Sequence, residues 1–564
     1  MIDKPPPTHA RGRSAGRRPL TASRTVRALT AVLCALGLSV TAGSPAVADS
    51  AHAGGDLQIA QTLGDRDLTF VLRRVTGLPG PLHVDVLTLR DTPAGSLRLR
   101  TVATGASRDR AAGAAAGTTT SSASVELGST PGAYGAALRI DHAGPWELVV
   151  DDGSREARIP FVVPDSVLSP PELVVYAGFV TAGGLILVTL FVAVRARRGS
   201  WVLVPVGGVV AALATAVTAA LLSASLPAPP EPGQEVAATV DNVTDPYAVV
   251  RPAARTHSRP PAALTVSSWT ARAGEPGTLR LNLADGSTGL PADDLVVHDG
   301  ALVHLLVIGP TGQIWHLHPI RTEPGTFEVE LRLPVAGHYA LSAEFARLGG
   351  GVQQVRSATG LTVAGRSSDD GDARALPADL VPRGPGTRTV GDVPVRLSAP
   401  SPTVGVASIL TVQVGDTATL QPWLGMIGHM FVVGPFDKAE ATSSTRLGEA
   451  AQDAQVWSHV HSMGGEMGTG HDTGGHSAHG TNGSGDAMSD SMSGLIPLDG
   501  GSAADQTVAA YGPDVSFVHT FSSPGYYRLW IQTLRDNTLL TSPYLLHVQP
   551  ATATASATTT GGAE

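Results

Sequence analysis

Histidines two residues apart occur twice in this chain, in the segments WHLHP (315–319) and WSHVHS (457–462). In a β-strand, residues two apart point to the same face, so each pair would present two imidazoles side by side. Imidazole is a good ligand for copper, zinc or nickel. Another histidine precedes each pair, in VHLLVIGP (303–310) and GHMFVVGP (428–435). The candidate metal ligands in these two matching sets are His304, His316 and His318, and His429, His459 and His461.

The turn after residue 308 decides whether the first histidine of its set can join the pair. With a four-residue turn, 309–312, His304 would face away from the other two. With a five-residue turn, 309–313, it stands opposite His318 on the same face, and we predict this register. The alternative interpretation is a set of buried histidines bound to the backbone, which an internal duplication has copied.

A glycine-rich insertion, residues 462–511, holds a second group of candidate ligands. Methionine in such a loop has no core to fill, whereas its thioether favours Cu(I) and imidazole binds Cu(II) or zinc. Every methionine except the initiator lies between residues 426 and 492. Copper is therefore favoured over zinc, and a solvated loop with incidental histidines is the alternative. The candidates in the insertion are Met463, Met467, His471, His476, His479, Met488 and Met492.

Three apolar segments indicate in which cellular compartment these ligands lie. Residues 1–48 have the basic, apolar and small-residue parts of a secretory signal, with cleavage expected after Ala48. The only cysteine, Cys34, lies in that signal, so we expect no thiolate ligand and hence no blue-copper centre in the mature chain. Segments 174–194 and 201–226 lack charged residues and are long enough to be transmembrane helices.

Three arginines separate the two apolar segments, within the sequence RARRGS. An excess of positive charge marks the cytoplasmic side of a membrane protein. We therefore expect a multi-pass cell-membrane protein whose N-terminal and C-terminal domains are both extracytoplasmic.

Proline-rich, polar segments divide the remainder into three outer domains, 49–166, 263–364 and 390–549. Leucines alternate with polar residues over 279–283, the period of a half-buried strand, and the middle domain accommodates seven such strands. The sequence thus predicts a mainly β protein with three immunoglobulin-like antiparallel sandwiches and a two-helix transmembrane hairpin. The expected connecting segments are a linker at 227–262, a second linker at 365–389 and a disordered tail at 550–564.

The domains also look like copies of one another. LPVAGHYALSAEF (333–345) matches FSSPGYYRLWIQT (521–533), and IDHAGPWELVV (140–150) shares the glycine and the aromatic residue. With DLVVHDGALVHLLVIGPTGQIWHLHP and LQPWLGMIGHMFVV, these motifs resemble the secreted YtkA-like or cupredoxin-like sandwich domains of bacterial membrane-anchored proteins. The resemblance covers residues 263–549. It implies a sandwich fold and an association with copper or other heavy metals, but no reaction.

Charge and motifs limit the functional class. The net charge of −9 with 15% charged residues argues against a nucleic-acid partner, and nucleophile-elbow, zinc-protease and phosphate-loop motifs are absent from the sequence. We expect a non-enzymatic, membrane-anchored protein that captures, buffers or hands over copper, with an extracytoplasmic protein as partner for metal exchange. The alternative is an adhesion or scaffold protein with no metal role.

Overall fold

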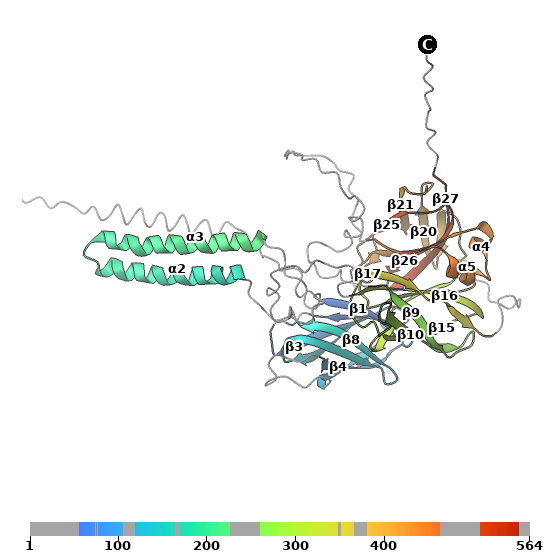
Figure 1. Ribbon diagram of the computed structural model, residues 1–564, viewed down its shortest axis with the longest axis horizontal. Coiled ribbons are helices and arrows are strands. Elements are labelled where there is room, and N and C mark those ends of the chain that lie inside the picture. Colours follow the sequence, from blue (N-terminus) through green and yellow to red (C-terminus); the bar gives the residue numbers. More distant parts are fainter. Residues whose placement is uncertain are drawn as a thin grey trace, which may run out of the picture. The chain divides into compact units, whose positions relative to one another are not determined.

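The computed structural model describes residues 56–73, 75, 77–104, 119–163, 170–225, 260–347, 351–365, 381–462 and 508–551, all within one compact unit, Ala51–Glu564. Paired antiparallel sheets build immunoglobulin-like sandwiches, and an apolar helical hairpin lies between the first two in sequence (Figure 1). The expected fold class is confirmed. The predicted signal segment, residues 1–48, lies outside the described residues.

The first sandwich consists of two four-stranded sheets, ordered β1-β2-β3-β6 and β5-β4-β7-β8. Alternate side chains of its strands, such as Leu82 and Val84, are buried between the sheets. The strands are β1 (Leu57–Leu63), β2 (Arg66–Leu72), β3 (Gly80–Thr88), β4 (Gly95–Ala103), β5 (Thr119–Leu127), β6 (Gly132–Ile140), β7 (Gly144–Asp151) and β8 (Glu156–Val163).

The second sandwich pairs the sheet β14-β15-β10-β9 with the sheet β11-β16-β12-β13, to which β17 and β18 add through β16. Ten strands form where seven were expected, because the long strand β16 pairs with several short ones. The strands are β9 (Ala262–Trp269), β10 (Pro276–Asp285), β11 (Leu295–Val296), β12 (His304–Ile308), β13 (Ile314–Leu317), β14 (Ile320–Glu323), β15 (Thr326–Arg332), β16 (Gly337–Arg347), β17 (Gly351–Arg356) and β18 (Leu361–Val363).

The third sandwich repeats this plan with the sheets β19-β20-β21-β25 and β22-β26-β23-β24, and β27 pairs with β26. The connection between β23 and β24 is longer than its counterpart and forms two short helices. The elements are β19 (Gly386–Val390), β20 (Val393–Ser398), β21 (Ala407–Val414), β22 (Leu420–Gln421), β23 (Gly428–Phe436), α4 (Lys438–Thr442), α5 (Leu447–Asp453), β24 (Val456–Ser462), β25 (Asp514–Thr520), β26 (Gly525–Arg535) and β27 (Thr538–Val548).

A recurring corner supports the predicted duplication. Gly337 and Gly525 begin equivalent strands with φ of +139° and +140°, a conformation that favours glycine. Two residues later, the hydroxyls of Tyr339 and Tyr527 each donate to a backbone carbonyl four positions upstream. The first sandwich has an equivalent hydrogen bond from a tryptophan, since Trp146 Nε1 donates to the backbone carbonyl four positions before it.

Strands β12 and β23 are buried on both faces, unlike the half-buried strands that surround them. One face of β12 packs into its own core through Leu305. Its other face, through Leu306, joins Phe431 of β23 in a separate apolar cluster between the second and third sandwiches. Since His304 and His429 lie two residues before Leu306 and Phe431, both histidines point into this interface.

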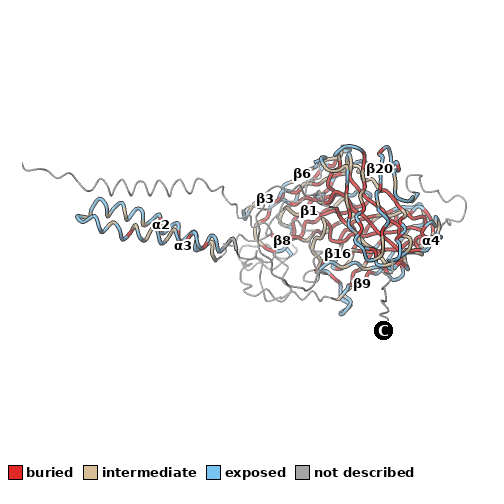
Figure 2. The backbone as a smooth tube through the Cα atoms, turned by 90° about the horizontal axis from the view of Figure 1, so that it is seen from above, coloured by how far each residue is buried: buried red, intermediate tan, exposed pale blue. Residues whose placement is uncertain are grey.

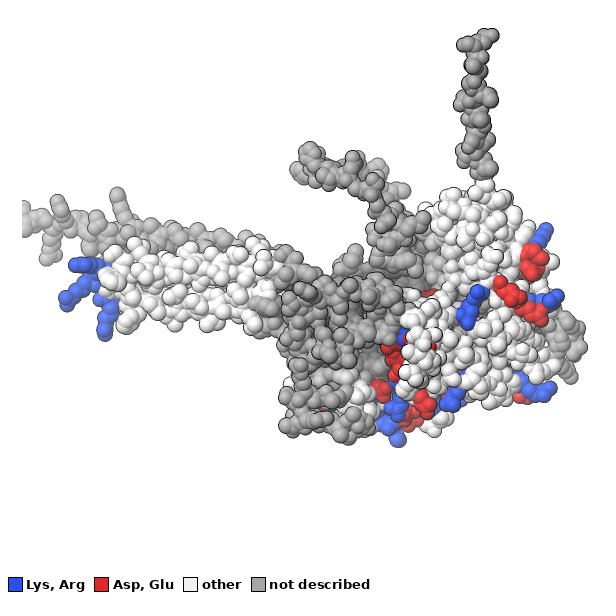
Figure 3. Space-filling model, viewed as in Figure 1, with Lys and Arg blue, Asp and Glu red and all other residues white. Residues whose placement is uncertain are grey.

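Helices α2 (Pro170–Arg195) and α3 (Leu203–Ser225), joined through a short 3₁₀ turn, form the hairpin. Both are long and apolar enough to cross a membrane, and their side chains are mostly exposed (Figure 2). A Cβ at Gly178 would lie 2.8 Å from the Ala216 Cβ, so the glycine allows the two helices to approach closely at this point. Basic side chains gather at the hairpin tip (Figure 3). These features indicate association with a membrane.

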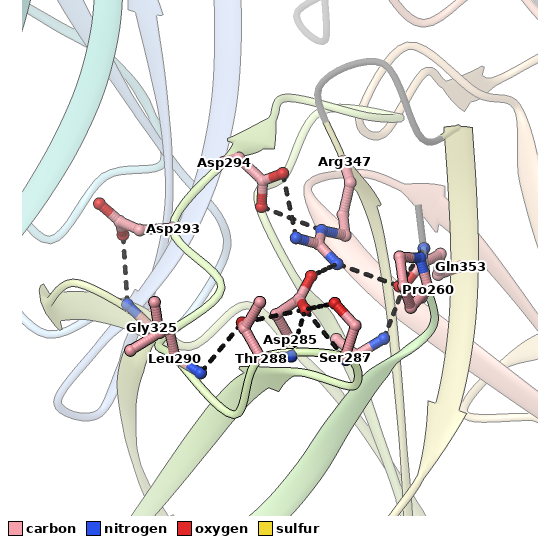
Figure 4. A network of polar contacts seen from close by, with 11 residues as sticks. Pro260, Asp285, Ser287, Thr288, Leu290, Asp293, Asp294, Gly325, Arg347 and Gln353 are labelled. Carbon is pink, nitrogen blue, oxygen red and sulfur yellow. Dashed lines mark hydrogen bonds and ion pairs between the residues drawn. The ribbon is translucent and has the colours of Figure 1, made fainter. Parts of the chain in front are cut away.

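A buried ion-pair network anchors the loop that precedes β11 (Figure 4). The Arg347 guanidinium, whose side chain is 2% exposed, pairs with Asp285 at 2.8 Å and with Asp294 at 2.9 Å, and also donates to the Pro260 carbonyl. Asp285 additionally accepts from the Ser287 hydroxyl at 2.6 Å. The loop leads into the segment 298–301, which lies beside the histidines.

Candidate metal centre

The register of the second-sandwich hairpin places its three histidines on one face. Ile308 pairs with Ile314, so the turn comprises residues 309–313. This is the predicted five-residue turn, and the prediction is confirmed. His304 therefore stands opposite His318, on the face that points away from the sandwich core.

The third sandwich repeats this register despite its longer connection. His429 pairs with His461, and Phe431 pairs with His459. Because residues two apart share a face, all three histidines face the second sandwich. The helices α4 and α5 take up the additional residues without changing the pairing.

The two histidine sets meet at the interface between the sandwiches. The His459 ring centroid lies 5.4 Å from that of His304 and 5.1 Å from that of His316, and His316 lies 5.6 Å from His429. All six histidine side chains are nearly inaccessible to solvent. The sequence had placed three histidines in each domain, and the structure brings the two sets together.

A hydrogen bond to the backbone fixes the tautomer of His304. His304 Nε2 lies 3.0 Å from the backbone carbonyl of His298, which can only accept, so the proton is on Nε2 and Nδ1 has a free lone pair. His316 Nδ1 lies 3.1 Å from the Gln532 side-chain amide, whose other end contacts Thr541. His316 Nε2 lies 3.1 Å from the lone pair on His304 Nδ1, so the two rings are in direct contact through their nitrogens.

The third-sandwich histidines show the same orientation, since each turns one ring nitrogen outward to an oxygen. His429 Nε2 donates to the Trp423 carbonyl at 3.2 Å, so its Nδ1 is a free lone pair. Carboxylates face the outward nitrogens of the other two, with His461 Nδ1 at 3.2 Å from Asp299 Oδ2 and His459 Nδ1 at 3.6 Å from Glu344 Oε1.

The inward nitrogens of this set converge as metal ligands do. His459 Nε2 lies 3.1 Å from His429 Nδ1 and 3.0 Å from His461 Nε2, and the three nitrogens lie within 4.8 Å of one another. Nitrogens bound at about 2.0–2.1 Å to one ion are about 3.3 Å apart at a tetrahedral angle and about 2.9 Å apart at a right angle. The separations fit a shared ion. Ligating histidines also usually donate their other N–H to a carbonyl or carboxylate, as His429 does to the Trp423 carbonyl.

The surroundings of the cluster disfavour the protonated, imidazolium form of most of its histidines. Burial first, and then the neighbouring imidazoles, lower the pKa of His304 to about 4. The same causes hold the pKa of four others well below the usual range, namely His316, His318, His429 and His461. These five imidazoles are therefore neutral at pH 7.

One end of the cluster is acidic. Burial would lower the pKa of His298, but its contacts with Asp299 at 2.9 Å and Glu344 at 3.7 Å outweigh this and raise it to about 9. Burial alone would raise the pKa of Glu344, whereas His459 and His298 together lower it. Sequence reasoning missed these three residues. His298 could have been found, since VHDGALVH aligns with PWLGMIGH when the two domains are superposed in sequence.

The first sandwich contacts the centre through β1. The Thr62 backbone N–H donates to the His318 carbonyl at 2.7 Å, and the Thr62 hydroxyl accepts from the His318 N–H at 3.0 Å. The Ala60 N–H donates to the Gly300 carbonyl at 2.7 Å. The edge of β1 thus holds the two loops that carry His318 and Asp299, a role for the first domain that the sequence did not reveal.

The insertion ligands Met463, Met467, His471, His476, His479, Met488 and Met492 lie outside the described residues. Met430, which precedes Phe431, points into the core of the third sandwich rather than toward the histidines. The donors that the described part of the chain offers at this centre are therefore imidazole nitrogens and carboxylate oxygens.

No known protein family and no characterised protein matches this chain in sequence. Among solved structures, the tetra-tandem repeat in the extending region of a large adhesion protein is 9% identical, with 88% of this chain and 74% of that chain covered and a TM-score of 0.14. The fibronectin(III)-like modules of Clostridium thermocellum CbhA are 10% identical, with 51% and 95% covered and a TM-score of 0.12. Likenesses at these TM-scores support no argument about function.

Proposed function

We propose that this protein binds a copper ion through His429, His459 and His461, and that it is a membrane-anchored, extracytoplasmic protein that captures, buffers or hands over the metal. The observation that supports this is the convergence of three ring nitrogens, 3.0 and 3.1 Å apart at the shared His459, where burial keeps His429 and His461 neutral. Neutral imidazole nitrogens at these separations match the ligand spacing around one metal ion.

The donor set favours Cu(II) among the divalent metals. Imidazole suits copper, zinc and nickel, and copper binds most tightly at a given nitrogen site. Without a thiolate, the site lacks the ligand of a blue-copper electron carrier. The methionines of the insertion would supply the soft ligands that Cu(I) prefers, so the same protein could receive copper in either oxidation state.

The membrane orientation belongs to the same proposal. Arg195, Arg197 and Arg198 at the hairpin tip favour a cytoplasmic tip, which puts all three sandwiches on the outer side of the membrane. Copper captured there would pass to a second extracytoplasmic protein. The proposal assigns the protein no reaction.

A titration of the metal-free full chain in detergent with Cu(II) tests the proposal. Copper retained after gel filtration is quantified by mass spectrometry and its ligands by electron paramagnetic resonance, where nitrogen hyperfine splitting is expected. The variant with His429, His459 and His461 changed to alanine should lose this signal. The control carries His83→Ala and His547→Ala, two exposed strand histidines, and should retain it.

The methionine contribution is measured separately, with Met463, Met467, Met488 and Met492 changed to leucine and Cu(I) as the probe. Loss of Cu(I) binding with intact Cu(II) binding would assign the two oxidation states to two places. If wild-type protein retains no copper, and the triple histidine variant melts at the same temperature with or without the metal, the scaffold interpretation is the better one.

A further inference from the structure

The tip of the helical hairpin carries three arginines without acidic partners. Arg195, Arg197 and Arg198 are all exposed (Figure 3), and none of them forms an ion pair within the described part of the chain. The sequence has no aspartate or glutamate between residues 173 and 225, so the helices supply no carboxylate near the tip. Three unpaired positive charges in one place attract a negatively charged ligand.

The turn between the helices brings these charges beside two aromatic rings. α2 ends at Arg195, and the Trp201 N–H donates to the Arg198 carbonyl at 3.3 Å, so the chain reverses direction within a short segment. A shallow hollow of about 470 Å³ forms there, lined by Phe191, Val192 and Trp201 beside the arginines. The Arg195 guanidinium carbon lies 5.7 Å from the centroid of the Phe191 ring. The hollow thus has a cationic part and an apolar part.

The length of α2 places this hollow among the phospholipid headgroups. The helix has 26 residues, which at about 1.5 Å each make it about 39 Å long. The hydrocarbon layer is about 30 Å thick, and the three charges keep this end of the helix outside it. Phe191 and Trp201 are 64% and 62% exposed, and tryptophan is enriched where hydrocarbon meets headgroups. The rings therefore lie against acyl chains, and the arginines lie at the level of the phosphates.

We propose that the hollow binds an anionic phospholipid, whose phosphate contacts the three arginines and whose acyl chains pack against Phe191 and Trp201. The guanidinium group presents paired N–H donors that match phosphate oxygens. A soluble phosphate would contact the arginines and leave the apolar wall uncovered, so a lipid fits the whole hollow. The inference needs insertion of the hairpin in a membrane, and it depends neither on metal binding nor on the side of the membrane that the tip faces.

The number of charges sets the expected preference. Each arginine near an anionic membrane surface contributes a factor of about five in affinity, so three contribute about 100-fold over a zwitterionic lipid. The cytoplasmic leaflet is the one rich in anionic lipids. A lipid site at the tip would therefore stabilise the arrangement in which the tip faces the cytoplasm.

Quenching of Trp201 by brominated lipid measures this preference. The sequence has seven tryptophans, and Trp201 is the one in the hairpin. The full chain is reconstituted in vesicles of equal parts phosphatidylcholine and phosphatidylglycerol, with bromine on the acyl chains of one lipid or of the other. Brominated phosphatidylglycerol should quench more strongly, because it is concentrated beside the ring. In the variant Arg195→Gln/Arg197→Gln/Arg198→Gln, the two lipids should quench equally.

A matched control removes the same number of charges from the sandwiches. Arg98→Gln/Arg139→Gln/Arg396→Gln changes three exposed strand arginines and should retain the preference for phosphatidylglycerol. Inorganic phosphate, compared with chloride at equal ionic strength, should leave the quenching of wild-type protein unchanged.

Three results overturn the inference. They are equal quenching by the two lipids in wild-type protein, a preference that survives the loss of the three tip arginines, and a preference that inorganic phosphate removes. The last result would assign the hollow to a soluble anion. Failure of both brominated lipids to quench Trp201 would overturn the insertion of the hairpin and the lipid site with it. None of these results bears on copper binding, which is tested separately.

Discussion

The metal-free protein should lose stability in mild acid because of its buried histidines. Five of them, His304, His316, His318, His429 and His461, have their pKa lowered by folding. In the unfolded chain each returns to a pKa of about 6.5. Below pH 6.5, the unfolded state binds protons at these histidines that the folded state does not bind. The free energy of unfolding is thus highest above pH 6.5 and falls as the pH decreases.

The expected effect is large. Between pH 7.5 and 5.5, each such histidine costs about 1.4 kcal/mol of unfolding free energy, whereas His298, whose pKa is raised to about 9, contributes about the same amount in the opposite direction. The net loss is about 5 kcal/mol, a sizeable part of a typical total of about 5–15 kcal/mol. Urea unfolding of the chelator-treated full chain at the two pH values measures this. The variant His318→Leu should lose about 1 kcal/mol of the pH dependence and none of the stability at pH 7.5, since its ring nitrogen has no partner to leave behind among the described residues.

The control is His83→Leu, an exposed strand histidine, which should keep the full pH dependence. Equal acid sensitivity of wild-type protein and His318→Leu would refute the reasoning, since it would mean that the buried imidazoles are as easily protonated in the folded chain as in the unfolded one. Saturating Cu(II) should oppose the acid transition, because metal and proton compete for the same nitrogens.

Three further variants probe the surroundings of the centre. Asp299→Asn removes the charge beside His461 and should weaken copper binding about 10-fold to 100-fold, measured by competition with a chelator. Trp423, whose ring lies 4.9 Å from a histidine ring of the centre, should lose fluorescence when Cu(II) binds, and Trp423→Phe should abolish most of the response in a stopped-flow titration. Thr62→Val removes the hydrogen bond to the His318 N–H, costs about 1 kcal/mol of stability and should speed metal release to a chelator, whereas unchanged release would mean that β1 does not hold the loop.

Local patterns in the sequence were enough to predict which strand face the histidines occupy and in which register the strands pair. The alternation of strand residues and the glycine turn after Ile308 predicted that His304 and His318 share a face, and the repeat predicted the same for His429 and His461. These are short-range properties of a hairpin, which periodicity and turn length determine.

The meeting of the two sets could not be read from periodicity. It depends on which outer sheet faces pack together, and that is a long-range property of domain association. One signal was available, since HLLVI and the run after His429 are apolar without interruption, as expected of strands buried on both faces. The carboxylate of Glu344 lies forty positions from His304 and reaches the other domain's His459, a contact that neither motif indicated.

The most direct test of the account is copper K-edge X-ray absorption of the full chain loaded with one equivalent of Cu(II). The account predicts about three imidazole nitrogens at about 2.0 Å, with the outer-shell scattering of the rings, and loss of this pattern in the variant with His429, His459 and His461 changed to alanine. A first shell of oxygen alone, or an imidazole pattern that survives in that variant, would contradict it.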